Sequence, residues 1–423
     1  MKPFIVAFVL GLFSARMLLP QPNAADMLAK TVIMGDENAL DHLLASGLDP
    51  NVTDRYGQTP LHVAILYHNA RAVNLLLRSH ADPNASLNRR ATHPLPPLQY
   101  AAREGDLLIV SSLLSAGARI NDRGGTGRSA LDYATQGNQL DIVGFLIEKG
   151  ADVNARDGEG ASPLDDAVWR RSLDAVAILL AHGARLNEPD SQTGATPINE
   201  AAFRGDDRIV AYLLQFHPDL TTPDKNGYSP FENALRRKNE SCALLLLDAL
   251  PKERQTGEFF AKAMDAAITG NEPRMVEALL QRNVPINAPM PSGLTPLNAA
   301  ASAGNADMAR VLLSNHADPN LVATTGATPL ENASLKGFES VVALLLDHGA
   351  RVDQLNRDSG TTALYAAASF GRAETVNLLL ERGARPNLCG TNRKTPLQAA
   401  TENGFTEIAA SLRSRGGVNR CAP

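Results

Sequence analysis

Hydrophobic positions along the chain recur at helical spacing in short segments, and polar stretches that contain glycine separate these segments. Ile109-Val110 stand about one helical turn before Leu113-Leu114, and Val341-Val342 have the same relation to Leu345-Leu346. Apolar residues three to four positions apart lie on one face of an α-helix. The pattern therefore predicts many short helices, each with one apolar face.

A second pattern marks where helices begin. In Thr59-Pro60-Leu61-His62, the Thr side chain can accept a backbone N–H bond as N-cap, and Pro suits the first helical position. The same start returns at Thr295, Thr328 and Thr395, and variants of it stand between them. Counted at the Thr position, the starts are residues 26, 59, 96, 129, 162, 196, 229, 262, 295, 328, 362 and 395.

The spacing of these starts is nearly constant. Eight of the eleven intervals are 33 residues, two are 34 and one is 37. The starts at 26 and 262 lack the Thr-Pro-Leu letters and are inferred from the period. A fixed period of this length predicts a repeat array of twelve units rather than one large core.

Each unit follows the same internal order. A first helix of about nine residues often ends at a glycine, such as Gly105 or Gly304, because glycine tolerates the left-handed backbone that stops a helix. A second helix ends at Gly-Ala-Asp/Arg-x-Asn, as in residues 150–154. A polar loop with another glycine follows, which indicates a β-turn or a short hairpin.

A unit with the start Gly-x-Thr-Pro-Leu-His-x-Ala and the loop Gly-Ala-Asp-x-Asn resembles the ankyrin repeat, and the resemblance covers roughly residues 26–423. It implies an all-α fold, an ankyrin-repeat solenoid of stacked helix–turn–helix units with β-hairpin or turn loops. The motif histidine persists only at His62; elsewhere, mostly polar side chains that can still cap the helix take its place.

The loop from residue 248 to residue 260 has lost the repeat motif, and the start at Lys262 that follows it is degenerate. We therefore expect a weak joint near 248–261 within one continuous array. This places repeats 1–7 in residues 26–261 and repeats 8–12 in residues 262–423.

The N-terminus is a candidate targeting segment. A short basic start with Lys2 precedes an apolar run over residues 4–13, and Ala24 and Ala25 are small residues suited to cleavage. The run is too short for a bilayer-spanning helix, which needs ~20 apolar residues, and it matches a secretory signal peptide over residues 1–25. Two alternatives stay open, namely a membrane anchor retained over residues 4–19 and a hydrophobic helix packed on the first repeat.

Composition narrows the function. The net charge of −5 gives no support to a nucleic-acid or membrane-surface binder. The three cysteines, Cys242, Cys389 and Cys421, are far apart and lack metal-ligand spacing, so we predict neither a disulfide framework nor a zinc site. A Cys389–Cys421 pair across the last two repeats is conceivable.

Catalytic motifs are lacking. The chain has no His-Glu-x-x-His, P-loop or Gly-x-Ser-x-Gly sequence. The histidines at the ends of second helices, such as His182 and His348, suit the negative end of the helix dipole. Asp132 and Asp165 occupy equivalent capping positions one repeat apart. We therefore predict no enzyme activity, cofactor, metal or small-molecule substrate.

One set of residues stands out as a candidate binding surface. The resemblance implies that positions seven and eight after the Thr line the concave face of the array. In three consecutive repeats these positions are Trp169-Arg170, Phe203-Arg204 and Arg236-Arg237. Trp and Arg are enriched at binding hot spots, and an acidic partner segment would suit them. The alternative is that the arginines cap helix ends and the aromatics fill gaps between layers.

The sequence thus predicts an exported, non-enzymatic protein–protein interaction scaffold, periplasmic or secreted, that binds a protein through its concave face and loops. Two alternatives are kept. One is a secreted effector or a protein that neutralises a toxin or an enzyme, and the other is a membrane-tethered structural element.

Overall fold

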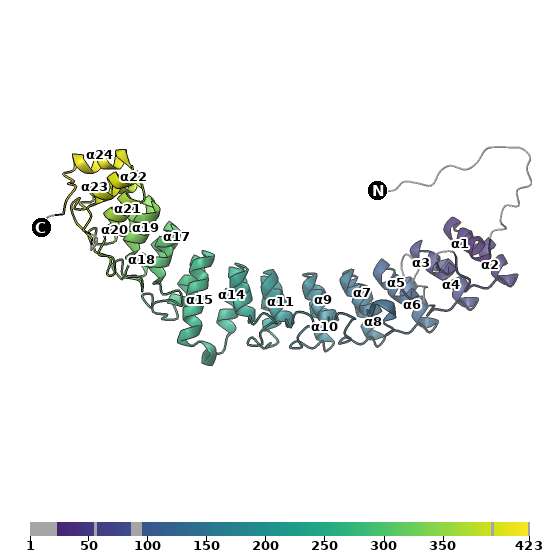
Figure 1. Cartoon of the computed structure of the whole chain (residues 1–423). Coiled ribbons are helices and arrows are strands. Elements are labelled where there is room, and N and C mark those ends of the chain that lie inside the picture. The colour runs from purple at the N-terminus through teal and green to yellow at the C-terminus, as the bar shows by residue number, and fades with distance from the viewer. Residues whose placement is uncertain (1–22, 55–56, 86–94, 391–392, 422–423) are drawn as a thin grey trace, which may run out of the picture. The chain divides into compact units, whose positions relative to one another are not determined.

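The computed structural model describes residues 23–54, 57–85, 95–390 and 393–421 (Figure 1). Within these ranges the chain forms 24 α-helices and two short 3-10 turns, and no strand. The predicted all-α repeat fold is therefore confirmed. Two compact units can be distinguished, residues 1–185 with 190–192 and residues 186–189 with 193–423.

The first unit holds five helix pairs. Its helices are α1 (Ala24–Met34), α2 (Glu37–Ala45), α3 (Pro60–Leu66), α4 (Ala70–Arg78), α5 (Pro97–Glu104), α6 (Leu107–Ser115), α7 (Ala130–Gln136), α8 (Leu140–Glu148), α9 (Pro163–Trp169) and α10 (Leu173–Ala181), with the 3-10 turn η1 (Gly124–Thr126) before α7.

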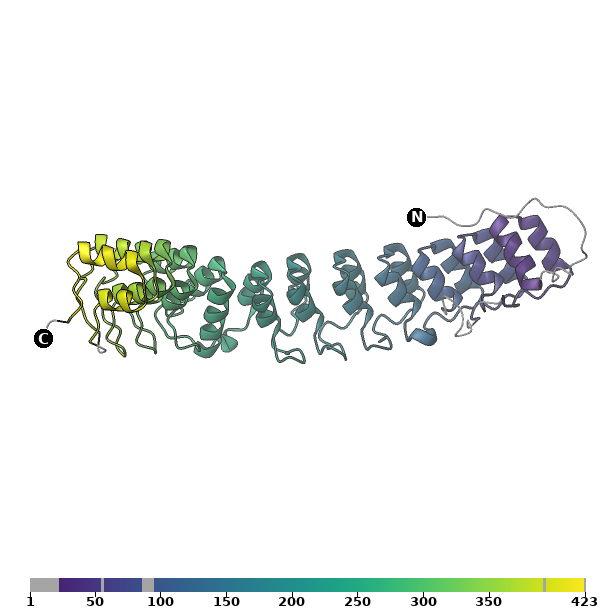
Figure 2. The ribbon, with the colours of Figure 1, turned by 45° about the horizontal axis from the view of Figure 1, so that its top comes forward.

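The second unit holds seven helix pairs. Its helices are α11 (Pro197–Arg204), α12 (Asp207–Leu214), α13 (Pro230–Arg236), α14 (Glu240–Ala249), α15 (Gly257–Gly270), α16 (Pro273–Leu280), α17 (Pro296–Ala303), α18 (Ala306–Ser314), α19 (Pro329–Lys336), α20 (Glu339–Asp347), α21 (Ala363–Ser369), α22 (Ala373–Glu381), α23 (Pro396–Glu402) and α24 (Thr406–Ser414), with the 3-10 turn η2 (Lys252–Arg254) before α15. Figure 2 shows that in each unit the loops project from one side of the paired helices.

The core of each layer is thin and consists of the predicted apolar positions. Ile109, Val110 and Leu113 of α6 are completely buried, as are Val341, Val342 and Leu345 of α20. Within each unit, each helix pair packs on its neighbours, which supply the apolar surface that one pair lacks.

The Thr-Pro-Leu-His start forms the predicted helix N-terminus and also joins two repeats. The hydroxyl of Thr59 lies 2.7 Å from Nδ1 of His62, and Nε2 of His62 lies 3.2 Å from the carbonyl oxygen of Leu95, directly before the start of the next repeat. Burial lowers the pKa of His62 to about 4. The neutral ring therefore donates from Nε2 to Leu95 and accepts the Thr59 hydroxyl proton at Nδ1.

The asparagine of the Gly-Ala-Asp/Arg-x-Asn loop links each loop to the next. The side-chain amide of Asn154 donates to the carbonyl of Gly183 at 3.1 Å, and its oxygen accepts the N–H of Arg185 at 2.8 Å. Asn320 makes the same two bonds to Gly349 and Arg351. Thr221 stands where this asparagine would be in the sixth repeat, and its hydroxyl bonds back to Asp219 within the same loop.

The segment after α14 departs from the expected repeat. Pro251 holds Leu250 in an extended conformation, and this ends α14. The η2 turn follows, and Thr256 then caps α15 by accepting the N–H of Phe259. The helix therefore begins at Gly257, and its N-cap lies six residues before the expected start at Lys262. Residues 248–261 lie inside the second unit, and the weakness of this joint stays a prediction.

The C-terminal repeat carries a disulfide. Cys389 and Cys421 are bonded, with their Cα atoms 6.0 Å apart, and Cys242 is a free, buried cysteine. Cysteine spacing led us to predict no disulfide framework, but the conceivable pair does form. The two residues are 32 positions apart, about one repeat, so the stacking of equivalent loops brings them together.

The predicted targeting segment lies mostly outside the described residues. Asn23 caps α1 by accepting the N–H of Asp26 at 2.7 Å, so this helix begins at Ala24. None of the helices within the described ranges combines the length and apolarity that crossing a bilayer requires.

Candidate functional site

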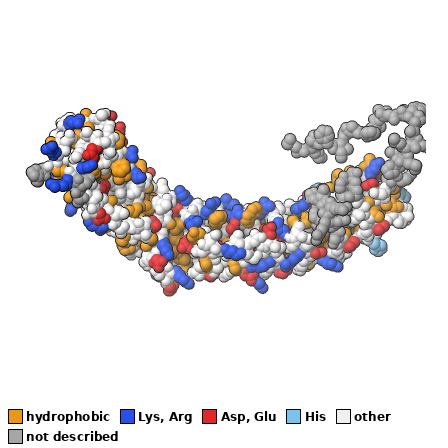
Figure 3. Space-filling model, in the orientation of Figure 1, with side chains coloured by type: hydrophobic (Ala, Val, Ile, Leu, Met, Phe, Trp, Pro, Cys, Tyr) orange, Lys and Arg blue, Asp and Glu red, His pale blue; other side chains and the backbone are white. Residues whose placement is uncertain are grey.

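The six candidate residues fall at the ends of first helices, in both compact units. Trp169 ends α9 and Arg170 follows it in the first unit. Phe203 and Arg204 end α11, and Arg236 and Arg237 stand at the end of α13, all in the second unit. We call the surface formed by the first helix of each repeat the first-helix face. Figure 3 shows Lys and Arg side chains along the edge of the molecule over α11 and α14.

The end of α11 is fixed by the next repeat. Gly205 adopts a left-handed conformation with φ of 71° and ends the helix. The side-chain amide of Asn239 donates to the carbonyl oxygens of Ala202 at 2.8 Å and Phe203 at 3.0 Å. A Cβ on Gly205 would lie 2.5 Å from Oδ1 of Asn239, so a larger residue would disturb this contact. The backbone that carries Phe203 is thus held against the turn after α13.

Guanidinium groups in the second unit rest on aromatic rings. The Cζ atom of Arg237 lies 4.6 Å from the ring centroid of Phe203 in the preceding repeat, and that of Arg236 lies 3.8 Å from the ring of Tyr228. These distances are within the range of cation–π contacts. Arg204 forms an ion pair with Glu200 one helical turn earlier. We call Phe203, Arg204, Tyr228, Arg236 and Arg237 the basic-aromatic cluster.

The cluster leaves two positive charges available. Glu200 is occupied by Arg204, and no carboxylate pairs with Arg236 or Arg237 in the part of the chain that the structure describes. Both guanidinium groups are solvent-exposed, and Phe203 is 41% exposed. The cluster therefore presents cations and an aromatic surface to a ligand.

The first unit presents a smaller version of this arrangement. Trp169 is 50% exposed, and the Cζ atom of Arg170 lies 5.0 Å from its ring centroid. Arg170 and Arg237 also occupy C-cap positions, as the alternative of helix-capping arginines expects. Trp169 and Phe203, however, keep about half of their surface in solvent, which gap-filling side chains would not.

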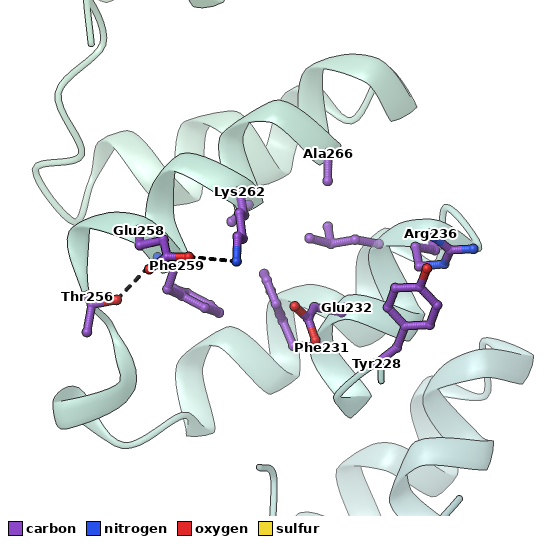
Figure 4. A pocket seen from close by; sticks show the side chains of 11 residues that line it. Tyr228, Phe231, Glu232, Arg236, Thr256, Glu258, Phe259, Lys262 and Ala266 are labelled. Atoms are coloured by element: carbon purple, nitrogen blue, oxygen red, sulfur yellow. Dashed lines mark hydrogen bonds and ion pairs between the residues drawn. The ribbon is translucent and has the colours of Figure 1, made fainter. Parts of the chain in front are cut away.

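A groove that the sequence did not predict lies between α13 and α15 in the second unit (Figure 4). It has a volume of about 370 Å³ and an apolar lining that includes Phe231, Leu235, Phe259, Ala263 and Ala266. The rings of Phe231 and Phe259 point toward one another with centroids 5.0 Å apart. Phe259 belongs to the extra first turn of α15, so the early start of this helix builds one wall of the groove.

Charged groups surround this groove. Arg236 of the basic-aromatic cluster lines it on the α13 side, and Lys262 lines it on the α15 side. Lys262 is 2.8 Å from Glu258, and their hydrogen bond raises the pKa of Lys262 and lowers that of Glu258. A carboxylate oxygen of Glu232 accepts the backbone N–H and the hydroxyl of Ser229, at 2.9 and 2.8 Å.

The remaining candidates for chemistry have structural roles. A carboxylate oxygen of Asp132 accepts the N–H and the hydroxyl of Ser129, and Asp165 does the same with Ser162. This confirms the predicted capping. His182 and His348 each place Nδ1 within 2.9 Å of a carbonyl one turn earlier. Within the described ranges, no three His, Cys, Asp or Glu side chains form a group that could hold a metal ion.

Asp166 in the first unit is a buried carboxyl group that sequence analysis missed. Nε2 of Gln136 in the preceding repeat donates to it at 3.0 Å, and Arg128 binds the neighbouring Asp157 instead. Burial raises the pKa of Asp166 to about 7, and the nearby charge of Asp132 adds to the shift.

We expect Asp166→Asn to stabilise the first unit at pH 8. The native carboxyl group keeps its proton to higher pH than the unfolded chain does, so its ionisation lowers the free energy of unfolding as pH rises from about 4 to about 7. A shift of about three pKa units is worth up to about 4 kcal/mol. Hydrogen exchange of α7 and α9 should slow in the variant at pH 8 and change little at pH 4. Asp174→Asn, at an exposed position of α10, is the control, and equal exchange in Asp166→Asn and wild type at pH 8 would contradict the expectation.

Comparison with known proteins places these features in a family. A family model described as ankyrin repeats (3 copies) matches residues 8–87, 27–123, 98–190, 167–255, 263–356 and 352–420. The chain is 28% identical over 217 residues to ankyrin repeat protein nuc-2 of Neurospora crassa, which covers 51% of this chain and 20% of that protein. It is 42% identical over 62 residues to a putative ankyrin repeat-containing protein of Treponema pallidum, covering 15% of this chain and 21% of that one.

These matches leave most of the relatives' length uncovered, since the chain spans about a fifth of each of the two proteins. Among solved structures, the ankyrin repeat domain of Bcl-3 is similar with 27% identity and a TM-score of 0.47, over 52% of this chain and 97% of that one.

Proposed function

The chain belongs to the ankyrin-repeat family, and we propose that it is a non-enzymatic scaffold that binds a protein partner through its first-helix face and loops and that it is exported. Ankyrin repeats generally serve protein–protein interaction, which is the part of the proposal that the family supports. The partner's chemistry and the compartment rest on this chain's own residues.

The observation that carries the binding proposal is the basic-aromatic cluster. Two guanidinium groups without a carboxylate partner lie against aromatic rings, an arrangement that is already ordered before a ligand arrives. Arginine and aromatic side chains supply most of the energy at protein interfaces, and less ordering entropy is lost when they are held in place. An acidic segment of the partner would give each guanidinium the carboxylate that it lacks.

Export is supported by the Cys389–Cys421 disulfide. Disulfides persist in oxidising compartments and are rare in the cytosol, where thiols are kept reduced. The apolar run over residues 4–13, with its basic start, agrees with a signal peptide. We therefore propose that the protein acts outside the cytoplasm, in the periplasm or in the external medium.

One purification tests both parts. The chain with a C-terminal tag is expressed in its own host and cross-linked, and the fractions are separated before capture. We expect the captured chain in the exported fraction, with an N-terminus near residues 25–26 and a specific cross-linked protein identified by mass spectrometry. A chain that lacks residues 1–25 is the control and should stay inside. Recovery of the full-length chain from membranes would contradict cleavage and export and would favour the membrane-tethered alternative. Recovery of the chain without a cross-linked partner would contradict the proposal that it is a binding scaffold.

A further inference from the structure

The groove between α13 and α15 is particular to the junction of the seventh and eighth repeats. Residue 262 is the periodic equivalent of Ser229 and Thr295, where α13 and α17 begin one residue later. Helix α15 instead begins at Gly257, so residues 257–262 extend beyond the neighbouring first helices. In the repeat before this junction, the sixth, Thr221 replaces the loop asparagine that links other repeats, and it bonds within its own loop. The groove thus lies where the repeat pattern is interrupted.

The groove has the size and the lining to receive one large apolar side chain. Its volume of about 370 Å³ is near the lower end of ligand pockets, which is about 300 Å³. Phe231 and Phe259 present their rings to it, and Leu235, Ala263 and Ala266 complete an apolar surface (Figure 4). An aromatic or large aliphatic side chain would bury apolar area against these groups and gain edge or stacking contacts with the rings.

The charges around the groove determine which residues of a bound peptide are favoured next to that side chain. The two acidic groups of the lining are already engaged, Glu232 by Ser229 and Glu258 by Lys262. Arg236 rests on Tyr228, and no carboxylate pairs with it among the described residues. Arg237, the next residue, is in the same state beside Phe203. On its α13 side the groove therefore offers a guanidinium group that can bind a carboxylate of a ligand.

We propose that the α13–α15 groove receives an aromatic or large aliphatic side chain from an acidic peptide segment of the partner, whose adjacent carboxylate binds Arg236. This rests on the proposed function, because it names the segment that the scaffold recognises. Arg236 belongs to both the groove and the basic-aromatic cluster, so the segment continues from the groove across Arg237 and Phe203.

A displayed library of random twelve-residue peptides tests this proposal without knowledge of the partner. The full-length chain is the target, and peptides that bind the Ala266→Trp variant are removed, because a tryptophan at this lining position fills the groove. We expect the enriched peptides to carry Phe, Trp, Tyr, Leu or Ile within two residues of Asp or Glu. A synthetic peptide of the enriched sequence should bind Ala266→Trp at least tenfold more weakly than wild type.

Two further variants show whether a loss of binding comes from the groove or from misfolding. Ala299→Trp places the same bulk at the equivalent position of α17, 33 residues later, and should change binding by less than twofold. Phe259→Ala removes part of the apolar lining without adding bulk and should weaken binding about tenfold. Enrichment of basic peptides, enrichment of none, or equal binding to the wild type and to both groove variants would overturn the proposal. If instead the native partner loses affinity with Arg204→Glu/Arg237→Glu but not with Ala266→Trp, the groove assignment fails and the scaffold function stands.

Discussion

We expect the double substitution Arg204→Glu/Arg237→Glu to weaken partner binding at least 100-fold and to leave the fold nearly unchanged. Arg237 has no carboxylate partner among the described residues, and its guanidinium lies 4.6 Å from the ring of Phe203. Loss of a hot-spot arginine costs about 2 kcal/mol or more, and a tenfold change in affinity corresponds to 1.4 kcal/mol. Reversal of charge adds repulsion toward an acidic segment.

The stability cost of this change should be small, because both side chains reach solvent. Arg204 loses its ion pair with Glu200 one turn earlier, and like charges at this spacing cost about 0.5 kcal/mol. We expect the melting temperature to move by less than about 3 °C. Binding is measured by titration of the captured partner.

A matched control separates local recognition from net charge. Arg208→Glu/Arg351→Glu changes the formal charge by the same amount at two exposed positions of the second unit, one in α12 and one in the loop after α20. It should bind like wild type at moderate salt. An equal loss in the control would mean that overall charge, and not the basic-aromatic cluster, governs association.

The second large effect concerns the disulfide. We expect Cys389→Ser/Cys421→Ser to destabilise the last repeat by about 3–4 kcal/mol, the chain-entropy value for a loop of 32 residues. The end of a repeat array has a neighbour on one side only, so the loss should appear as local opening. Hydrogen exchange should accelerate in α23 and α24 and stay unchanged in α11.

Reduction provides the control for this variant. Dithiothreitol should bring the wild-type exchange of α23 and α24 to the level of the serine variant and should not affect the variant itself. Equal protection of α24 in the oxidised and reduced wild type would contradict a stabilising role of the disulfide.

The regular part of the fold could be predicted because its signals are local and repeated. Thr59, Thr295 and Thr328 each cap a first helix, and the 33-residue period placed nearly all the others. Burial of Val341, Val342 and Leu345 follows from helical spacing alone. These features can be predicted without knowing which side chains of adjacent repeats contact one another.

The irregular features depended on contacts between repeats. Thr256 is an N-cap signal before Phe259, but the period indicated a start at Lys262, and the period gave the wrong residue. The cysteine pair needed the stacking of two loops, and the raised pKa of Asp166 needed Gln136 and Asp132 from the preceding repeat. The period defines equivalent positions; it does not define how their side chains pack.

The candidate surface could be predicted in part. Helical register put Phe203, Arg204, Arg236 and Arg237 at the ends of adjacent first helices, as the structure has them. It could not indicate that Arg237 lies against Phe203 and Arg236 against Tyr228, because each arginine has several rotamers and rings within reach. The groove beside them was missed together with the early start of α15.

Site-specific photo-cross-linking tests the central claim most directly. The photoreactive amino acid p-benzoylphenylalanine replaces Phe203 on the first-helix face, and in a matched chain it replaces Phe216, which follows α12 and is similarly exposed, at 44% against 41%. We predict a cross-link to one protein partner from position 203 and not from position 216. Equal cross-linking from both positions, or from position 216 alone, would contradict a partner site on the basic-aromatic cluster.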